Sequence, residues 1–225
     1  MAGSNWIRAF RSFICAFGQR RRLCFGASWQ AVAIQTGIAT AFALLIASSV
    51  LKLNLTESMP IGFYLLRRTT TVHVGDIVIA CPPPVAQRLG IANGYLPRAY
   101  GLIPDSKCTE GSVPVLKYAI ALAGDEIELD GSGLSLNGRL INTRPRALVD
   151  RRRRRLVSLT NGRYRLRQGD VWLYSPEQYG WDSRYFGPIR QSDVLGIAKP
   201  IWTMKDGFRF TEDAFPITSC RSYHL

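Results

Sequence analysis

The stretch PVLKYAIALAGDEIEL, residues 114–129, joins two short apolar runs through a Gly-Asp turn. The runs Val113–Ala123 and Glu126–Leu129 are bounded by turn residues, which is typical of β-strands. One charged side chain, Lys117, interrupts the first run. The stretch therefore predicts two consecutive strands of a sheet, with a lysine among apolar neighbours.

Similar runs occur on both sides of this stretch, at Phe63–Leu66, Asp76–Cys81, Asp170–Ser175 and Val194–Met204. The segment LSLNGRLI, residues 134–141, alternates around an Asn-Gly pair, which is the strongest short-range signal of a β-hairpin. Strong amphipathic helices are not evident after residue 51. We therefore expect a mainly β fold, an antiparallel and partly closed β domain. The Pro- and Gly-rich stretch 82–111 is interpreted as an excursion from that sheet.

The N-terminal part has a different pattern, because no charged residue occurs between Arg22 and Lys52. About 20 apolar residues are enough to cross a bilayer as a helix. The basic flank before this run favours a cytoplasmic N-terminus, so that the rest of the chain is exported. The lipid bilayer is thus an expected partner. The predicted organisation is a basic cytoplasmic segment 1–28, a transmembrane anchor 29–51, a β-rich domain 52–204 and a tail 205–225.

A cleavable signal peptide is the alternative to an anchor, because small residues occur near the end of the run at Ala43, Ala47 and Ser49. The run is long for the apolar region of a signal peptide, which favours an uncleaved anchor. A buried helix of a soluble protein fits less well, since the stretch has no polar face.

Export divides the five cysteines between two redox compartments. Those on the cytoplasmic side or at the membrane edge, where thiols stay reduced, are Cys15 and Cys24. Those that are exported, and can form disulfides, are Cys81, Cys108 and Cys220. A bridge from Cys81 to Cys108 would pin the 82–111 excursion and stabilise the fold by roughly 3–4 kcal/mol. Three free buried thiols are the alternative.

The net charge of +13 is concentrated in two clusters, five arginines before residue 23 and the continuous run Arg151–Arg155. The run is interpreted as a solvated loop between strands, and contact with anionic lipid headgroups is the alternative. Nucleic-acid binding is not expected, because aromatic residues are not interleaved with the arginines and the compartment does not fit.

The sequence lacks the GxSxG, HExxH and GxxxxGK signatures. It has no Cys/His cluster with metal-ligand spacing and two histidines, His73 and His224. We therefore expect neither a zinc site nor a cofactor. Neither histidine has the context of a Ser-His-Asp triad, which leaves a serine paired with a lysine as the remaining serine-based arrangement.

Lys117 is the candidate base of such a pair. An amine must be neutral to accept a proton, and with a reference pKa of about 10.4 only about one lysine in 2,500 is neutral at pH 7. Burial disfavours the charged form, and a pKa of roughly 7–8 corresponds to about 3–5 kcal/mol of differential interaction. The alternative is a lysine on an edge strand that points to solvent.

Three segments, in this order along the chain, resemble the signal peptidase I superfamily. They are Ser58-Met59-Pro60 with Gly62 and Tyr64, Lys117 followed by Ala123-Gly124-Asp125, and the DSRYFGP segment Asp182–Pro188. The version SMPIGFYLL, with Cys81-Pro82-Pro83, Gly94-Tyr95-Leu96 and Cys108, is similar to the TraF branch of conjugal-transfer peptidases, which mature the pilin subunit. The resemblance covers roughly residues 50–202.

The resemblance implies a signal-peptidase-like coiled antiparallel β domain with one N-terminal transmembrane helix, and a Ser-Lys endopeptidase. Ser58 would be the nucleophile and Lys117 the general base. The backbone N–H of Ser58 and the hydroxyl of Thr56 match the positions of the oxyanion hole. The supporting residues, with a salt bridge between the first and the last, are Asp182, Ser183 and Arg184.

One position departs from the resemblance. In ordinary signal peptidases a serine two residues before the Asp helps to orient the lysine, and here that position is Gly180. Ser183, another hydroxyl, a water molecule or packing alone would have to hold Lys117. The candidate residues of the substrate pocket are Met59, Pro60, Phe63 and Tyr64, although core packing explains the two aromatic residues equally well.

The expected function is that of a membrane-anchored serine endopeptidase at the periplasmic face of the bacterial inner membrane. It would cleave, and as in some TraF relatives cyclise, a membrane-inserted pilin-type precursor. Seven residues separate Leu51 from Ser58 and span at most roughly 23–25 Å, which keeps the nucleophile near the bilayer. The alternatives are a catalytically inactive scaffold of a conjugation or secretion complex and a general leader peptidase.

Overall fold

The computed structural model describes residues 29–47, 50–69, 71–99, 108–142 and 145–204. The predicted cytoplasmic segment 1–28 and tail 205–225, and with them Cys15, Cys24 and Cys220, lie outside the described residues. The chain divides into two units, residues 1–43 and 44–225, and each is described by itself.

Helix α2 (Trp29–Ala47) is built from apolar and small residues with no acidic or basic side chain. The hydroxyl of Thr36 donates to the carbonyl oxygen of Val32 over 2.8 Å, so this polar group is satisfied within the helix. The helix ends at Ala47, and Leu51, the last residue of the predicted anchor, already begins strand β1. None of the helices in the described residues combines the length and the apolarity that a membrane crossing requires.

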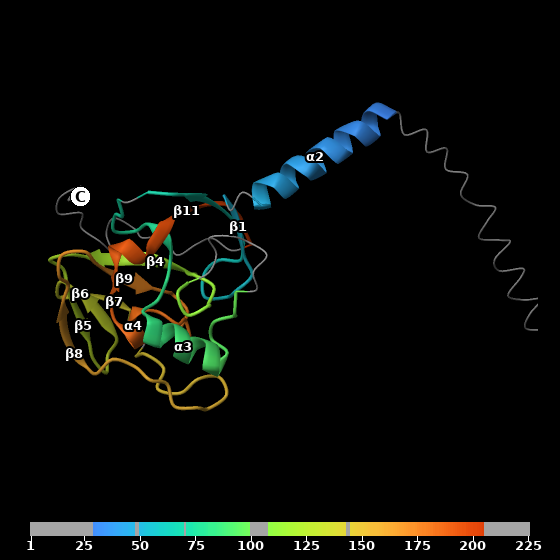
Figure 1. Ribbon diagram of the computed structural model, residues 1–225. Coiled ribbons are helices and arrows are strands. Elements are labelled where there is room, and N and C mark those ends of the chain that lie inside the picture. The colour runs from blue at the N-terminus through green and yellow to red at the C-terminus, as the bar shows by residue number, and fades with distance from the viewer. Residues whose placement is uncertain (1–28, 48–49, 70, 100–107, 143–144, 205–225) are drawn as a thin grey trace, which may run out of the picture. The chain divides into compact units, whose positions relative to one another are not determined.

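The larger sheet has seven antiparallel strands in the order β1-β2-β11-β3-β4-β9-β10 (Figure 1). Chain segments far apart in sequence therefore lie side by side. The strands are β1 (Leu51–Asn54), β2 (Gly62–Arg67), β3 (Ile77–Ala80), β4 (Val115–Leu122), β9 (Asp170–Tyr174), β10 (Ile189–Arg190) and β11 (Val194–Thr203).

A second sheet of four antiparallel strands has the order β7-β6-β5-β8. Its strands are β5 (Glu126–Leu129), β6 (Leu134–Leu136), β7 (Arg139–Asn142) and β8 (Gly162–Arg165). The predicted hairpin joins β6 and β7, with positive φ at Asn137 (50°) and Gly138 (78°), as a two-residue type I′ turn requires. The turn that connects β4 to β5 is closed by Asp125, whose carboxylate accepts from Leu122 N over 2.8 Å. The mainly β, antiparallel fold is thus confirmed.

Helix α3 (Pro84–Asn93) lies within the 82–111 excursion, where the sequence did not predict a helix. Proline is compatible with the first helical position, since that N–H has no intrahelical partner, and Pro84 occupies it. The helix ends at Gly94, whose φ of 76° is left-handed and favours glycine. Proline therefore begins a helix here rather than only interrupting a strand.

The buried side chain of Gln87 on α3 ties the two ends of the excursion together. Its amide nitrogen donates to Pro82 O over 2.6 Å, and its oxygen accepts from Glu110 N over 2.9 Å. A disulfide joins Cys81 and Cys108 across the same base, with the Cα atoms 5.6 Å apart. The excursion is thus held to the sheet by a covalent bond and by a buried amide.

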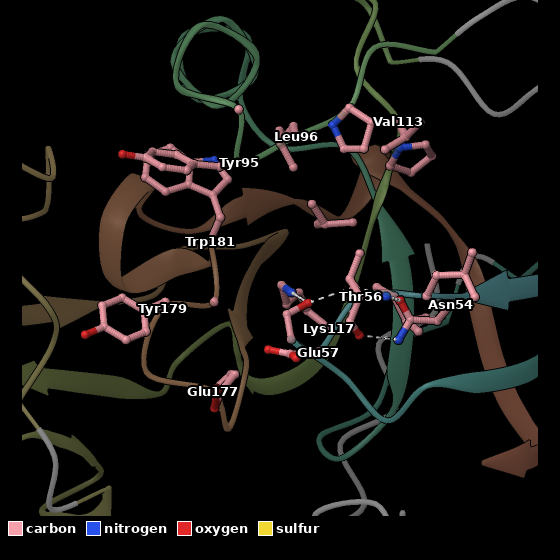
Figure 2. A pocket seen from close by; sticks show the side chains of 18 of the residues that line it. Asn54, Thr56, Glu57, Tyr95, Leu96, Val113, Lys117, Glu177, Tyr179 and Trp181 are labelled. Atoms are coloured by element: carbon pink, nitrogen blue, oxygen red, sulfur yellow. Dashed lines mark hydrogen bonds between the residues drawn. The ribbon is translucent and has the colours of Figure 1, made fainter. Parts of the chain in front are cut away.

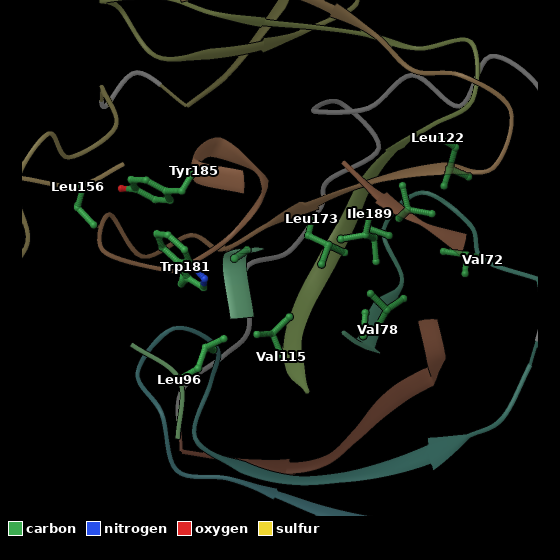
Figure 3. Close-up of a cluster of buried hydrophobic side chains, with 14 of the residues drawn as sticks. Val72, Val78, Leu96, Val115, Leu122, Leu156, Leu173, Trp181, Tyr185 and Ile189 are labelled. Carbon is green, nitrogen blue, oxygen red and sulfur yellow. The ribbon is translucent and has the colours of Figure 1, made fainter. Parts of the chain in front are cut away.

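Strand β4 is buried on both of its faces. Val115 and Ala119 pack into the cluster shown in Figure 3, with Val78, Leu173 and residues of the excursion. Other side chains of β4, such as that of Ile120, pack into a second cluster with residues of the four-stranded sheet. Because β4 lies between β3 and β9, Lys117 is inside the fold, and the alternative of an edge-strand lysine is excluded.

Replacing Cys81 and Cys108 together by serine should lower the free energy of unfolding by about 3.5 kcal/mol, because the unfolded chain regains the entropy of the closed loop. Urea unfolding of the oxidised wild type and of the double variant measures this difference. The wild type under reducing conditions should match the variant. A loss below about 1 kcal/mol would show that the excursion is held by its packing and hydrogen bonds instead.

Candidate active site

Ser58 lies in the loop between β1 and β2, and the side chain of Asn54 shapes this loop. The amide nitrogen of Asn54 donates to the carbonyl oxygens of Thr56, Met59 and Pro60, each over 3.0 Å. Its oxygen accepts from the backbone N of Thr56 over 3.1 Å and from the Thr56 hydroxyl over 2.7 Å. One side chain therefore holds the residues before and after Ser58 in a fixed turn.

Two buried side chains fasten this loop to the body of the domain. Met59 is 2% exposed and packs in the cluster between the two sheets. Tyr64 on β2 is fully buried, and its hydroxyl donates to Pro60 O over 2.6 Å. Burial, together with the nearby Tyr118, raises the pKa of Tyr64 to about 12, so this hydroxyl keeps its proton at neutral pH.

The amine of Lys117, from β4, meets the hydroxyl of Ser58. Lys117 Nζ donates to Ser58 Oγ over 2.7 Å, and Thr56 Oγ1 lies 3.3 Å from the same hydroxyl oxygen. Lys117 is 3% exposed, whereas Thr56 and Ser58 lie at the surface end of the contact. The three residues that the sequence assigned to nucleophile, base and oxyanion hole are thus brought together. Figure 2 shows two of them, Thr56 and Lys117, side by side.

Burial lowers the pKa of Lys117 from its usual 10.5 to about 8. The carboxylate of Asp182 opposes this shift and the guanidinium of Arg184 adds to it. About one amine in ten is then neutral at pH 7. The desolvated site therefore supplies a base that an exposed lysine does not provide at neutral pH.

Asp182 and Arg184 form a buried ion pair behind this site. The Asp182 side chain caps helix α4 (Ser183–Phe186) through Arg184 N and also accepts from Arg184 Nε over 2.9 Å and Arg184 NH2 over 2.7 Å. Burial acts to lower the pKa of Arg184, but the adjacent carboxylate raises it overall, so the guanidinium stays charged. Removing one partner would leave an uncompensated buried charge.

The hydroxyl of Ser183 makes its hydrogen bond elsewhere, not to Lys117, and Gly180 has no side chain that could hold the amine. The Ser183 hydroxyl accepts from Leu173 N over 2.9 Å and joins α4 to β9. A residue that the sequence reasoning missed, Ser175, lies beside Gly180 instead. The Ser175 hydroxyl donates to the carbonyl oxygen of Ser58. No motif marked this serine, because its partner is 117 positions away in the chain.

A cavity of about 1190 Å³ opens at Ser58 and Lys117. Figure 2 shows Tyr95, Leu96 and Trp181 on one side of it and the Asn54–Glu57 loop on the other. Its other walls include β1, residues 93–99 at the end of helix α3 and beyond it, residues 113–117, residues 177–181 and the arginine turn with Asp150, Arg151, Arg152 and Arg154. The excursion therefore forms one wall of the cavity, opposite the loop of Ser58.

Two of the four residues predicted to line a substrate pocket do line this cavity, Phe63 and Tyr64. Met59 and Pro60 are not among its lining residues. The role of all four residues in a substrate pocket stays a prediction.

The arginine run 151–155 forms a turn, as the loop interpretation predicted, but it is not wholly solvated. Arg151 NH2 lies 3.2 Å from the carboxylate of Glu57 and 3.5 Å from that of Glu177. Its guanidinium also lies over the ring of Tyr179. These partners are largely exposed, so the pairs add little stability, but they connect the turn to the residue before Ser58.

Arg154 connects the same turn to the excursion. It pairs with Asp150 over 2.6 Å, donates to Asn93 O over 2.7 Å and lies over the ring of Tyr95.

Among the described residues, no group of three histidine, cysteine or acidic side chains is arranged to hold a metal ion.

Residues 25–203 match the family described as signal peptidase, peptidase S26. Because this match covers most of the chain, the protein belongs to that family. Its mainly β, antiparallel fold is consistent with a signal-peptidase-like domain.

Individual relatives narrow the similarity to one kind of protein in the family. The chain is 35% identical to the probable conjugal transfer protein TraF of Sinorhizobium fredii. The 154 aligned residues are 68% of this chain and 77% of that protein. It is 30% identical over 159 residues to a plasmid transfer protein TraF of Escherichia coli, an alignment that covers 68% of this chain and 82% of that protein. It is also 30% identical over 179 residues to the conjugal transfer protein TraF of Agrobacterium tumefaciens, covering 77% and 96%. The resemblance to the TraF branch is therefore confirmed.

Replacing Lys117 by methionine should raise the free energy of unfolding at pH 7 by about 2–3 kcal/mol. With the pKa lowered from 10.5 to about 8, the wild type holds a buried charge below pH 8, and its stability rises as the pH increases from 8 to 10.5. The advantage of the variant should therefore disappear above about pH 10. Urea unfolding at several pH values measures this, and the exposed Lys199→Met is the control. An advantage of equal size at every pH would contradict a lowered pKa.

Proposed function

We propose that this protein is a membrane-anchored serine endopeptidase that cleaves a pilin-type precursor for conjugative transfer. The single observation that carries the peptidase assignment is the 2.7 Å contact between Lys117 Nζ and Ser58 Oγ at the edge of a large cavity. Membership of the signal peptidase S26 family supports the same chemistry.

The reaction begins with the fraction of molecules in which the Lys117 amine is neutral. The Ser58 hydroxyl then donates to that amine, and its oxygen attacks the scissile carbonyl carbon as the proton passes to Nζ. The tetrahedral intermediate collapses when Lys117 returns the proton to the leaving amine. An ester between Ser58 and the N-terminal part of the substrate remains.

The negative oxygen of the tetrahedral intermediate needs hydrogen-bond donors. The backbone N–H of Ser58 and the hydroxyl of Thr56 are proposed to supply them, each worth about 3–4 kcal/mol of barrier in other proteases. In the free protein the Thr56 hydroxyl donates to Asn54 Oδ1. It would turn from Asn54 toward the substrate oxygen when the oxyanion forms.

The ester is resolved by a nucleophile that the site admits. Attack by water releases a linear product and regenerates the Ser58 hydroxyl. Attack by the substrate's own N-terminal amine forms a peptide bond instead and yields a cyclic product that is lighter by one water. Lys117 accepts the proton of the attacking group in both cases.

The substrate class and the location are supported by the relatives and by the sequence. TraF proteins of three organisms carry conjugal or plasmid transfer in their names. The uncharged run between Arg22 and Lys52 supports an anchor in the inner membrane, with the catalytic domain in the periplasm. A membrane-inserted precursor would then present an extended segment at the depth of Ser58. The cavity beside β1 suits such a segment.

Ser58→Ala and Lys117→Ala should each abolish precursor cleavage, because one lacks the nucleophile and the other the base.

The full-length protein in detergent is treated with a serine-directed acylating inhibitor, and mass spectrometry locates the adduct. The wild type and the exposed control Ser192→Ala should be modified at Ser58. A wild type that takes no adduct, or a Lys117→Ala variant that reacts as fast as the wild type, supports an inactive scaffold.

The rate of Ser58 acylation should rise with pH and level off above about pH 8, since the neutral form of Lys117 is the active one. Below pH 7 the rate should fall about tenfold for each pH unit. Stopped-flow or quench measurements with the same inhibitor give this profile. Lys199→Ala should leave it unchanged, and a profile flat from pH 6 to 9 would contradict the role of Lys117.

A further inference from the structure

We propose that Ser175 is a positioning residue that holds Ser58 against Lys117. This inference rests on the proposed function of that pair. Ser175 follows strand β9 and is fully buried. Its hydroxyl donates to the carbonyl oxygen of Ser58, which makes it a direct link between the body of the sheet and the nucleophile.

The bond to the Ser58 carbonyl completes the fixation of the nucleophile loop. Asn54 binds the carbonyl oxygens of the residues at positions 56, 59 and 60, but not that of Ser58. Ser175 binds the Ser58 carbonyl, which Asn54 leaves free. The peptide unit after Ser58 is therefore held by a hydrogen bond from the body of the sheet. Its rotation would carry the Ser58 hydroxyl away from Lys117 Nζ.

Ser175 is itself held by the buried ion pair. Its backbone N donates to Asp182 Oδ2 over 2.8 Å, and its carbonyl oxygen accepts from Arg184 NH2 over 3.1 Å. Both backbone polar groups of Ser175 are thus held by side chains of the DSRYFGP segment. The Asp182–Arg184 pair acts on the geometry of Ser58 through this serine.

Gly180 provides an independent observation. A β-carbon built at Gly180 would overlap Ser175 Oγ and lie 2.5 Å from Ser175 Cβ. The backbone of Gly180 is not in the left-handed region, so lack of space, rather than φ, is what excludes a side chain. The glycine leaves the volume that the Ser175 side chain occupies.

The first experiment compares Ser175→Ala with the wild type by the rate of Ser58 acylation. The variant should lose roughly 10- to 100-fold in the maximal acylation rate while the half-saturating concentration of inhibitor stays the same, because only the geometry of the nucleophile changes. Ser175→Thr, which keeps the hydroxyl donor, should retain most of the rate. Ser192→Ala is the matched surface control. A maximal rate for Ser175→Ala within twofold of the wild type, in a folded protein, would overturn the proposal.

A second readout does not depend on peptidase activity. The Lys117 Nζ environment is followed by NMR of protein labelled with 13C at lysine Cε, and Lys117→Met identifies the signal. The wild-type midpoint should lie at about 8. Ser175→Ala should move it toward 10.5, because a released loop admits water to the amine. An unchanged midpoint would contradict the positioning role even if the wild type proved inactive, so the two proposals fail in different ways.

A double-mutant cycle tests the packing part of the argument. Gly180→Ala should lower both the unfolding midpoint and the acylation rate while Ser175 is present, since the new methyl group displaces the serine side chain. In a Ser175→Gly background the same change should have little further effect. Wild-type stability and acylation in Gly180→Ala would show that the two positions do not compete for space.

Discussion

A buried amine, almost wholly shielded from water, lies at the inner end of the cavity. Lys117 is carried by a strand with neighbours on both sides and apolar clusters on both faces, so its ammonium form is poorly solvated. The same arrangement that disfavours the charge lowers the pKa toward neutrality. The inner position of β4 and the pairing of β3 and β9 with it both contribute to that environment.

Ser58, the proposed nucleophile, lies in a loop, and loops are not held in place by the pairing of strands. Its position therefore depends on hydrogen bonds and on the packing of one neighbour. Hydrogen bonds from Asn54 and Tyr64 fix the backbone of this loop, and the buried Met59 fastens it to the core. The Asp182–Arg184 pair lies behind both elements. A buried pair of this kind adds little net stability, but it orients the backbone groups around it. Apolar packing thus lowers the pKa of Lys117, the proposed base, and a hydrogen-bond network positions Ser58, the proposed nucleophile.

The sequence predicted the strands that are apolar or alternating to within about two residues, because burial on a pleated sheet produces that pattern directly. It missed β8, whose GRYR sequence is polar, the two-residue strand β10, and β1, whose LKLN sequence begins at the end of the apolar run. It predicted Ser58 and Lys117 through local segments with a recognisable order. Ser175 has no local signal, since its role depends on a contact with the distant Ser58. Helix α3 carries little sequence signal, because it begins in the run Pro82–Pro84 and proline usually interrupts regular structure.

The wall of the cavity that carries Tyr95 and Leu96 comes from one segment, closed at its base by the bond between Cys81 and Cys108. The proposed catalytic side chains, those of Ser58 and Lys117, come from other segments, which form the sheet and the β1–β2 loop. Substitutions or insertions in this module would therefore reshape the surface that a substrate meets without disturbing the groups that react with it.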